Sequence, residues 1–160
     1  MSEDRTRAED AADRIGLAHT VVRHGPVRSL QEAAEARGVT PAAVVKTLVV
    51  RVTDDDYRFV LVPGDREISW PKLRALLGVN RLSMPSAEVA KEVTGYERGT
   101  ITPLGSSHRW PVVADAAMTG RVSLGGGAHG VALTVEADDV VRLLDATIAD
   151  VTDPVGDAER

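Results

Sequence analysis

The stretch Val44-Val45-Lys46-Thr47-Leu48-Val49-Val50-Arg51-Val52 is the segment around which the rest of this 160-residue chain is arranged. Its run of β-branched residues and leucine is typical of a strand that is buried on both faces. Lys46 interrupts the run early, and lysine is among the residues least often found fully buried. Because side chains alternate along a strand, Lys46 shares its face with Leu48 and Val50 and points either into the core or to the floor of a cleft.

Two interpretations of Lys46 remain open at this point. A lysine sealed in the core without a partner would lose its charge, with a pKa shift of up to ~3–5 units. A cleft that receives an anionic or carbonyl-bearing ligand removes that conflict. Alternatively, Lys46 lies near the start of the strand and extends its ammonium to water.

Length and composition favour one domain over residues 1–160, with a core from about residue 18 to residue 151 and a peripheral arm and tail. The absence of cysteine excludes disulfides, thiolate catalysis and cysteine-ligated metals. No apolar run approaches the ~20 residues of a membrane-spanning helix, and the N-terminus lacks a signal-peptide pattern, so a cytoplasmic protein is expected. The net charge of -5 argues against extensive nucleic-acid backbone binding but allows a local basic patch.

The remaining elements follow from local patterns. Residues 57–63 form a second strand and pair with the first as a hairpin. Ser29, Ser69 and Ser86 are predicted N-caps of short helices, and Ser29 with Glu32 predicts a capping box. Residues 1–13 either begin a helix that runs to about residue 17 or form a frayed arm. Further helices and strands are expected at residues 18–24, 81–84, 111–114, 121–124, 131–135, 137–144 and 146–151, followed by a polar tail. Irregularly mixed strands and helices indicate an α/β fold of α+β type, with a mixed sheet flanked by helices.

Two loops could carry function. Gly125-Gly126-Gly127-Ala128-His129-Gly130 contains the pattern G-x-G-x-x-G, but a strand follows it instead of the helix that a dinucleotide site requires. It is either a hairpin turn or a place where a ligand approaches the backbone. The segment from Gly99 to Gly105 lies in a long connection and is either a surface loop or the wall of a site.

Other catalytic constellations are weak. The four histidines lack metal-ligand spacing and have no acidic cluster beside them, so no metal site and no cofactor are expected. His129 is either an exposed loop residue or part of a site formed by the glycine loop. Ser106, Ser107 and His108 are adjacent in sequence, which is not the geometry of a catalytic triad.

Three motifs occur together in order: the strand with Lys46, the segment Thr94-Gly95-Tyr96-Glu97-Arg98-Gly99 followed by Pro103-Leu104-Gly105, and the glycine loop. This set resembles the YbaK/ProX family of aminoacyl-tRNA deacylases and the related editing insertion of bacterial prolyl-tRNA synthetases. The similarity extends from about Ser29 to Ala146. It implies a barrel-like mixed sheet and hydrolysis of the ester between a mischarged amino acid and the terminal ribose of a tRNA.

The resemblance also implies site residues. The family's lysine falls on Lys46, its G-x-x-x-P loop on Gly99 and Pro103, and its glycine-rich turn on Gly125 to Gly127. Lys46 would hold the terminal phosphate or the ester region, and backbone N–H groups around Gly99 and Gly126 would face the carbonyl oxygen. A ribose hydroxyl or a bound water would attack. The residues assigned to substrate binding are Thr47, Thr100, Pro103, Gly125, Gly127 and His129, with Lys72, Arg74, Arg98 and Arg109 as candidate phosphate contacts.

The implied partner is the acceptor end of an aminoacyl-tRNA, with a synthetase as a second candidate partner, and neither membrane nor DNA. Gly125 stands where the cysteine-specific members have a serine, and Thr20-Val21-Val22 is non-aromatic where they have a tyrosine. Both departures argue against cysteinyl specificity, and a small amino acid such as alanine fits the expected pocket. The sequence thus predicts a trans-editing hydrolase, and a non-catalytic tRNA- or nucleotide-binding module of the same fold is the alternative.

Overall fold

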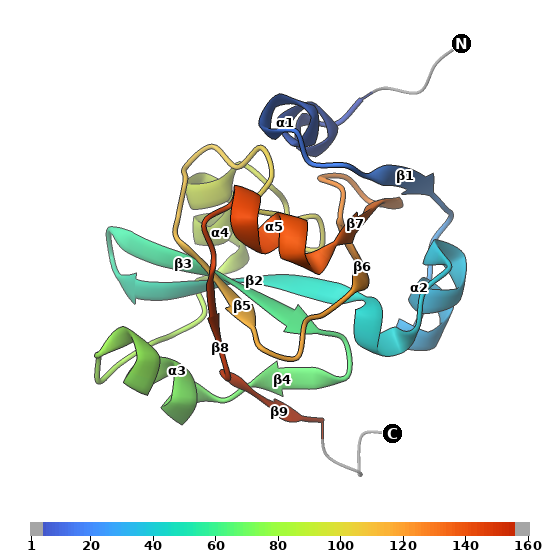
Figure 1. Ribbon diagram of the computed structural model, residues 1–160. Helices are drawn as coiled ribbons and strands as arrows, with labels where there is room; N and C mark the ends of the chain where they lie inside the picture. Colours follow the sequence, from blue (N-terminus) through green and yellow to red (C-terminus); the bar gives the residue numbers. More distant parts are fainter. Residues whose placement is uncertain (1–4, 156–160) are drawn as a thin grey trace.

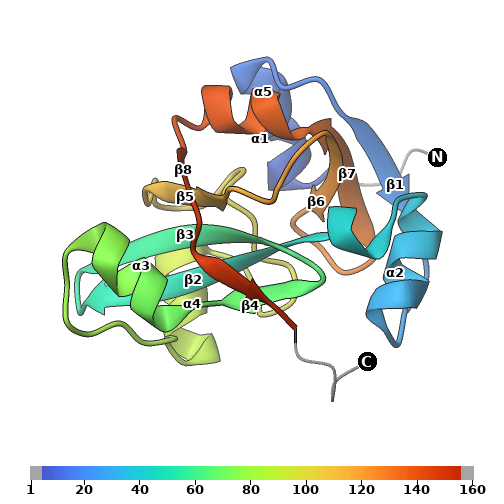
Figure 2. The same cartoon turned by 60° about the horizontal axis from the view of Figure 1, so that its bottom comes forward.

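The computed structural model describes residues 5–155, and Figures 1 and 2 show the arrangement of its elements. In chain order these are α1 (Arg7–Ile15), β1 (Thr20–Arg23), α2 (Leu30–Arg37), a 3-10 turn (Pro41–Ala43), β2 (Val45–Thr53), β3 (Asp56–Pro63), β4 (Arg66–Ile68), α3 (Trp70–Leu77), α4 (Ala87–Thr94), β5 (Val112–Asp115), β6 (Arg121–Gly125), β7 (Val131–Glu136), α5 (Ala137–Leu143), β8 (Thr147–Ala149) and β9 (Thr152–Pro154).

The strands form a mixed four-stranded sheet in the order β2-β3-β5-β8, an antiparallel three-stranded sheet β1-β7-β6, and the pair β4-β9. β2 and β3 form the expected hairpin, whereas β5 runs parallel to β3 and to β8. A single bridge between Val44 and Ser123 joins the two larger sheets. The expected α/β fold with a mixed sheet is therefore confirmed, although the barrel-like core consists of separate sheets over the described residues.

The β2–β3 hairpin is buried on both faces, as its sequence predicts. One face packs into the main core, which contains Val49, Phe59 and Leu61. The other face carries Val50 and Val60 into a smaller cluster under α3. Figures 1 and 2 agree that α3 and the β4–β9 pair lie on the side of the hairpin opposite to α1 and α5.

Capping side chains fix the ends of the helices. The hydroxyls of Ser29, Ser69 and Ser86 each accept a hydrogen bond from the backbone N–H three residues later. These three N-caps are confirmed, but the second half of the Ser29 capping box is wrong. The Glu32 carboxylate accepts from the N–H of Arg28 at 3.1 Å, one residue before the cap.

Short strands are where the sequence prediction fails. The strand expected at residues 81–84 is reduced to one bridge between Ser83 and Arg51. Part of the expected polar tail forms β9, which pairs with β4, and the rest of that tail lies outside the described residues. Three-residue strands contain too few positions for alternation to be recognised.

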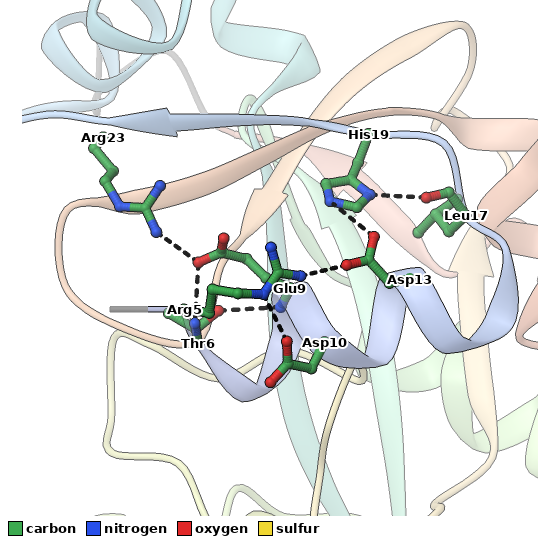
Figure 3. Close-up of polar contacts among 8 residues, drawn as sticks. All are labelled: Arg5, Thr6, Glu9, Asp10, Asp13, Leu17, His19 and Arg23. Atoms are coloured by element: carbon green, nitrogen blue, oxygen red, sulfur yellow. Dashed lines mark hydrogen bonds and ion pairs between the residues drawn. The ribbon is translucent and has the colours of Figure 1, made fainter. Parts of the chain in front are cut away.

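The helix α1 is attached to β1 by a buried carboxylate. Figure 3 shows Glu9 between Thr6, whose N–H it accepts at 3.0 Å, and Arg23, whose Nη2 lies 2.7 Å away. Only 3% of the Glu9 side chain is exposed. The longest described helix is α1, whose nine residues are less than half of the ~20 that a membrane crossing requires.

Candidate functional site

The main cavity of the protein has a volume of about 570 Å³ and lies along the unpaired edge of β2. Arg51 exchanges two backbone hydrogen bonds with Ser83, so its peptide groups point away from β3. Alternation along the strand directs the peptide groups of Thr47 and Val49 to the same side. The bridges at Val44 and Arg51 mark the two ends of this edge, and the cavity occupies the space between them.

The wall opposite β2 includes the connection between α4 and β5, which is fixed by hydrogen bonds. The Tyr96 hydroxyl donates to the carbonyl of Leu104 at 2.6 Å, and the Thr100 hydroxyl donates to the carbonyl of Glu97 at 2.7 Å. The Arg7 guanidinium lies 4.6 Å from the centre of the Tyr96 ring. Burial raises the pKa of the Tyr96 phenol, and the hydrogen bond and charge of Arg7 oppose this rise. This segment is therefore a packed wall.

Lys46 lies at the start of β2, and its exposed side chain lines the cavity. Its ammonium donates to the carbonyl of Arg66 at 2.9 Å. Partial burial lowers the pKa of Lys46, whereas the nearby carboxylates of Glu67 and Asp65 raise it. The lysine thus reaches water, as one sequence interpretation held, and also belongs to a cavity, as the other held.

The two glycine segments meet Lys46 at this cavity through Gly99 and Gly125. Gly99 has a φ of 88°, which favours glycine, and its N–H has no acceptor among the described residues. Gly126 differs from the expectation, because its N–H donates to the carbonyl of Val131 at 2.8 Å. That amide closes the β6–β7 hairpin and is not a free donor for a ligand.

The other residues assigned to substrate binding have different positions. Thr47 lines the cavity, and its hydroxyl oxygen is buried without a hydrogen-bond partner. Thr100 is buried in the wall, and Gly127 packs against Tyr96. Pro103 lines a separate cavity of about 350 Å³ beside Trp110. The structure therefore brings Lys46, Thr47, Gly99 and Gly125 together but leaves Pro103 outside this group.

His129 belongs to a second cavity of about 500 Å³, which adjoins the first. The two cavities share Arg37, Gly99 and Gly125. The imidazole of His129 covers Gly99 so closely that a Cβ on this glycine would lie 3.4 Å from the ring.

Sequence reasoning missed Arg37 and His24. The Nε of Arg37 and the Nε2 of His24 are buried and have no hydrogen-bond partner, which makes them, with the Thr47 hydroxyl, the unpaired buried side-chain atoms of the described chain. All three residues line one or both of the adjoining cavities. In the sequence, Arg37 looks like a charged residue in the last turn of a helix, and no local signal distinguishes it.

The candidate phosphate contacts are spread over the surface. Lys72 is paired with Asp150 and Asp153, both at 3.1 Å. Arg109 lines the cavity that contains Pro103, and Arg74 lines a further cavity near Asn80. Arg98 alone among these four lines the main cavity.

Fold and site together define an α/β domain with a cavity that is edged by cations and has no carboxylate among its lining residues. This class of site suits an anionic or ester ligand. The sequence model of the aminoacyl-tRNA editing domain matches residues 24–143, and the chain belongs to this family.

Known relatives agree with the family. The proline–tRNA ligase of Bacillus licheniformis is 30% identical over 123 residues, which cover 75% of this chain and 21% of the ligase. That of Thermosipho melanesiensis is 37% identical over 115 residues, covering 72% of this chain and 19% of the ligase. The chain thus spans about a fifth of the length of these ligases.

A solved structure described as a candidate trans-editing enzyme for prolyl-tRNA synthetase superposes with a TM-score of 0.84. It is 26% identical in sequence, and the match covers 92% of this chain and 95% of that chain. The expected relationship to editing domains is therefore confirmed.

Proposed function

We propose that this protein hydrolyses the ester bond between a small amino acid and the terminal ribose of a mischarged tRNA. The observation that carries this proposal is the convergence of Lys46, Gly99 and Gly125 on one cavity in a chain of the editing family. The relatives that support it are prolyl-tRNA ligases and a candidate trans-editing enzyme for such a synthetase.

The size of the cavity supports a substrate larger than a free amino acid. Ligand pockets commonly have volumes of ~300–1,000 Å³, and the 570 Å³ here would accommodate an aminoacyl group with part of its nucleoside. The lining of the cavity includes the apolar residues Ile101 and Ala90 and has no carboxylate, which favours a small uncharged amino-acid side chain.

Positioning and charge stabilisation are the chemistry that this site offers. An aminoacyl ester is already activated, so orientation of the ester and stabilisation of the developing negative charge supply most of what catalysis needs. The free N–H of Gly99 would donate to the carbonyl oxygen as it becomes negative. Lys46 would place its cation near the ester, and a ribose hydroxyl or a water would attack the carbonyl carbon.

The test is a deacylation panel with the purified chain. The tRNA for proline, charged with alanine, serine, cysteine or proline, would be incubated with wild type, with Lys46→Ala and with Lys91→Ala. Lys91 is a control lysine on α4 that is exposed and outside the cavity. We expect hydrolysis of a mischarged species that Lys46→Ala reduces strongly and Lys91→Ala does not. Saturable binding of these tRNAs without any hydrolysis would instead establish the alternative, a binding module of the same fold.

A further inference from the structure

The Arg37 guanidinium is partly buried and has no ion-pair partner among the described residues. Burial lowers the pKa of its guanidinium, and no carboxylate of the described chain forms an ion pair with it. Its Nε has no partner, and its Nη1 reaches only the Ser123 hydroxyl at 3.4 Å. A desolvated charge is costly unless it is paired. The helix C-terminus beside Arg37 favours a positive charge, but this accounts for neither its burial nor its unused donors.

The surroundings of Arg37 are selective for anions. Arg37 lies where the two cavities meet, and neither cavity has an aspartate or glutamate among its lining residues. The chain as a whole has a net charge of -5, so a carboxylate-free region is not what its composition favours. A planar guanidinium with several free donors matches the oxygens of a phosphate group.

The two cavities have different character. The main cavity carries Lys46, the free Gly99 amide and an apolar lining, which suit the aminoacyl ester. The second cavity is lined by His24 and His129 together with glycine backbone. An aminoacyl nucleotide carries its ester and its 5′ phosphate on opposite sides of one ribose, so a protein that binds it needs two adjacent subsites.

We propose that Arg37 and the second cavity form the subsite for the phosphate of the substrate's terminal nucleotide. This inference rests on the proposed deacylase function and adds to it a phosphate-binding residue that the sequence motifs do not contain. Gly99 and Gly125, which line both cavities, lie at the ribose between the two subsites.

The experiment uses adenosine 5′-monophosphate as the probe and adenosine and inorganic phosphate as the comparison ligands. Each would be titrated into the ¹⁵N-labelled full chain, and NMR would follow the backbone amides of residues 24–27 and 125–130 and the Nε–H signal of Arg37. The variants are Arg37→Gln, Arg37→Lys, and Arg28→Gln as the matched control. Arg28 is exposed, lies just before the N-cap of the same helix and lines neither cavity.

We expect the monophosphate to bind more tightly than either comparison ligand and to shift the Arg37 Nε–H signal. Arg37→Gln should weaken its binding roughly tenfold, as for the loss of one charge-assisted hydrogen bond. Arg37→Lys should give an intermediate affinity because it keeps the charge and loses the planar fork, and Arg28→Gln should bind as wild type does. The amide spectra of the free variants report whether each one folds.

Equal binding of adenosine and the monophosphate overturns the proposal, as does binding that Arg37→Gln leaves unchanged. If inorganic phosphate binds as tightly as adenosine 5′-monophosphate, the assignment of this subsite to a nucleotide phosphate is refuted. The deacylase function is tested separately by hydrolysis with the wild-type protein. Arg37-dependent binding without hydrolysis would refute the deacylase alone, whereas hydrolysis with Arg37-independent binding would refute this subsite alone.

Discussion

Replacing Thr47 by valine tests whether the cavity carries a stability cost for function. The Thr47 hydroxyl oxygen is buried on β2 and has no hydrogen-bond partner. An unsatisfied buried hydroxyl costs about 1–3 kcal/mol relative to a paired one. Valine has nearly the same shape and fits a strand equally well, so Thr47→Val should remove that cost without opening a hole.

The expected gain in the free energy of unfolding is about 1 kcal/mol, at the lower end of that range. For a domain of this size, this raises the melting temperature by about 2–4 °C. Thr94→Val is the matched control, because the fully buried Thr94 hydroxyl donates to the carbonyl of Ala90 at 2.7 Å and accepts from the N–H of Tyr96 at 3.1 Å. The same chemical change there should lower the free energy of unfolding by about 1–3 kcal/mol.

Urea denaturation followed by circular dichroism measures both changes, and deacylation kinetics measure the effect on function. If Thr47 binds the substrate, Thr47→Val should be more stable and less active than wild type. A loss of stability in Thr47→Val comparable to that in Thr94→Val would show that the Thr47 hydroxyl is satisfied in solution, and the reasoning from unpaired atoms would fail.

Three further substitutions separate structural from functional roles. Gly126→Ala should destabilise the fold by about 1–3 kcal/mol in urea denaturation, because its Cβ would lie 2.6 Å from Val131 Cγ1 and 2.8 Å from the Val131 carbonyl oxygen; Gly125→Ala, whose nearest contact is 3.4 Å, should keep its stability. Glu9→Ala should lower the free energy of unfolding by about 2 kcal/mol by the same assay, since it removes a buried ion pair and half of a capping box; a urea midpoint equal to that of wild type would contradict this. Because burial lowers the pKa of Lys46, its ammonium loses the proton at a lower pH than that of a free lysine. The deacylation rate of wild type, corrected for spontaneous hydrolysis, should therefore begin to fall at a lower alkaline pH than the rate of Lys46→Arg. Identical pH–rate profiles of the two proteins would argue against a role for the Lys46 charge.

Local sequence patterns predict those parts of the fold that local forces determine. The buried β2–β3 hairpin and the N-caps at Ser29, Ser69 and Ser86 follow from residue types within a few positions. The β4–β9 pair does not, because its two three-residue strands are far apart in sequence and become strands only by meeting each other. Because both faces of β2 are apolar, the sequence also cannot show to which side of the strand the Lys46 side chain points.

The candidate site is divided in the same way. The sequence alone identifies Lys46, Gly99 and Gly125 as candidates for the cavity lining. Lys46 is a charged residue within an apolar strand, and the two glycines lie in segments rich in glycine. Arg37 and His24 conflict with nothing nearby, and only the folded chain shows that their nitrogen atoms are buried without partners. The prediction that the Gly126 N–H donates to the substrate is wrong for a different reason. A glycine motif cannot show that the β6–β7 hairpin already uses this N–H in a hydrogen bond to Val131.

The edge of β2 explains why these residues gather where they do. An exposed strand edge is a liability that proteins usually cover, and residues 5–155 cover only the two ends of this edge, with Ser123 at Val44 and Ser83 at Arg51. Between them, no strand of the described part of the chain pairs with the peptide groups of Thr47 and Val49. A polar ligand that enters the cavity therefore meets unpaired backbone groups of β2, the Gly99 amide and two cations, Lys46 and Arg37, near the end of the edge marked by Val44 and Ser123. A fifth strand paired with this edge of the four-stranded sheet would occupy the cavity and abolish the site, so the proposed function requires that the edge between the two bridges stays open.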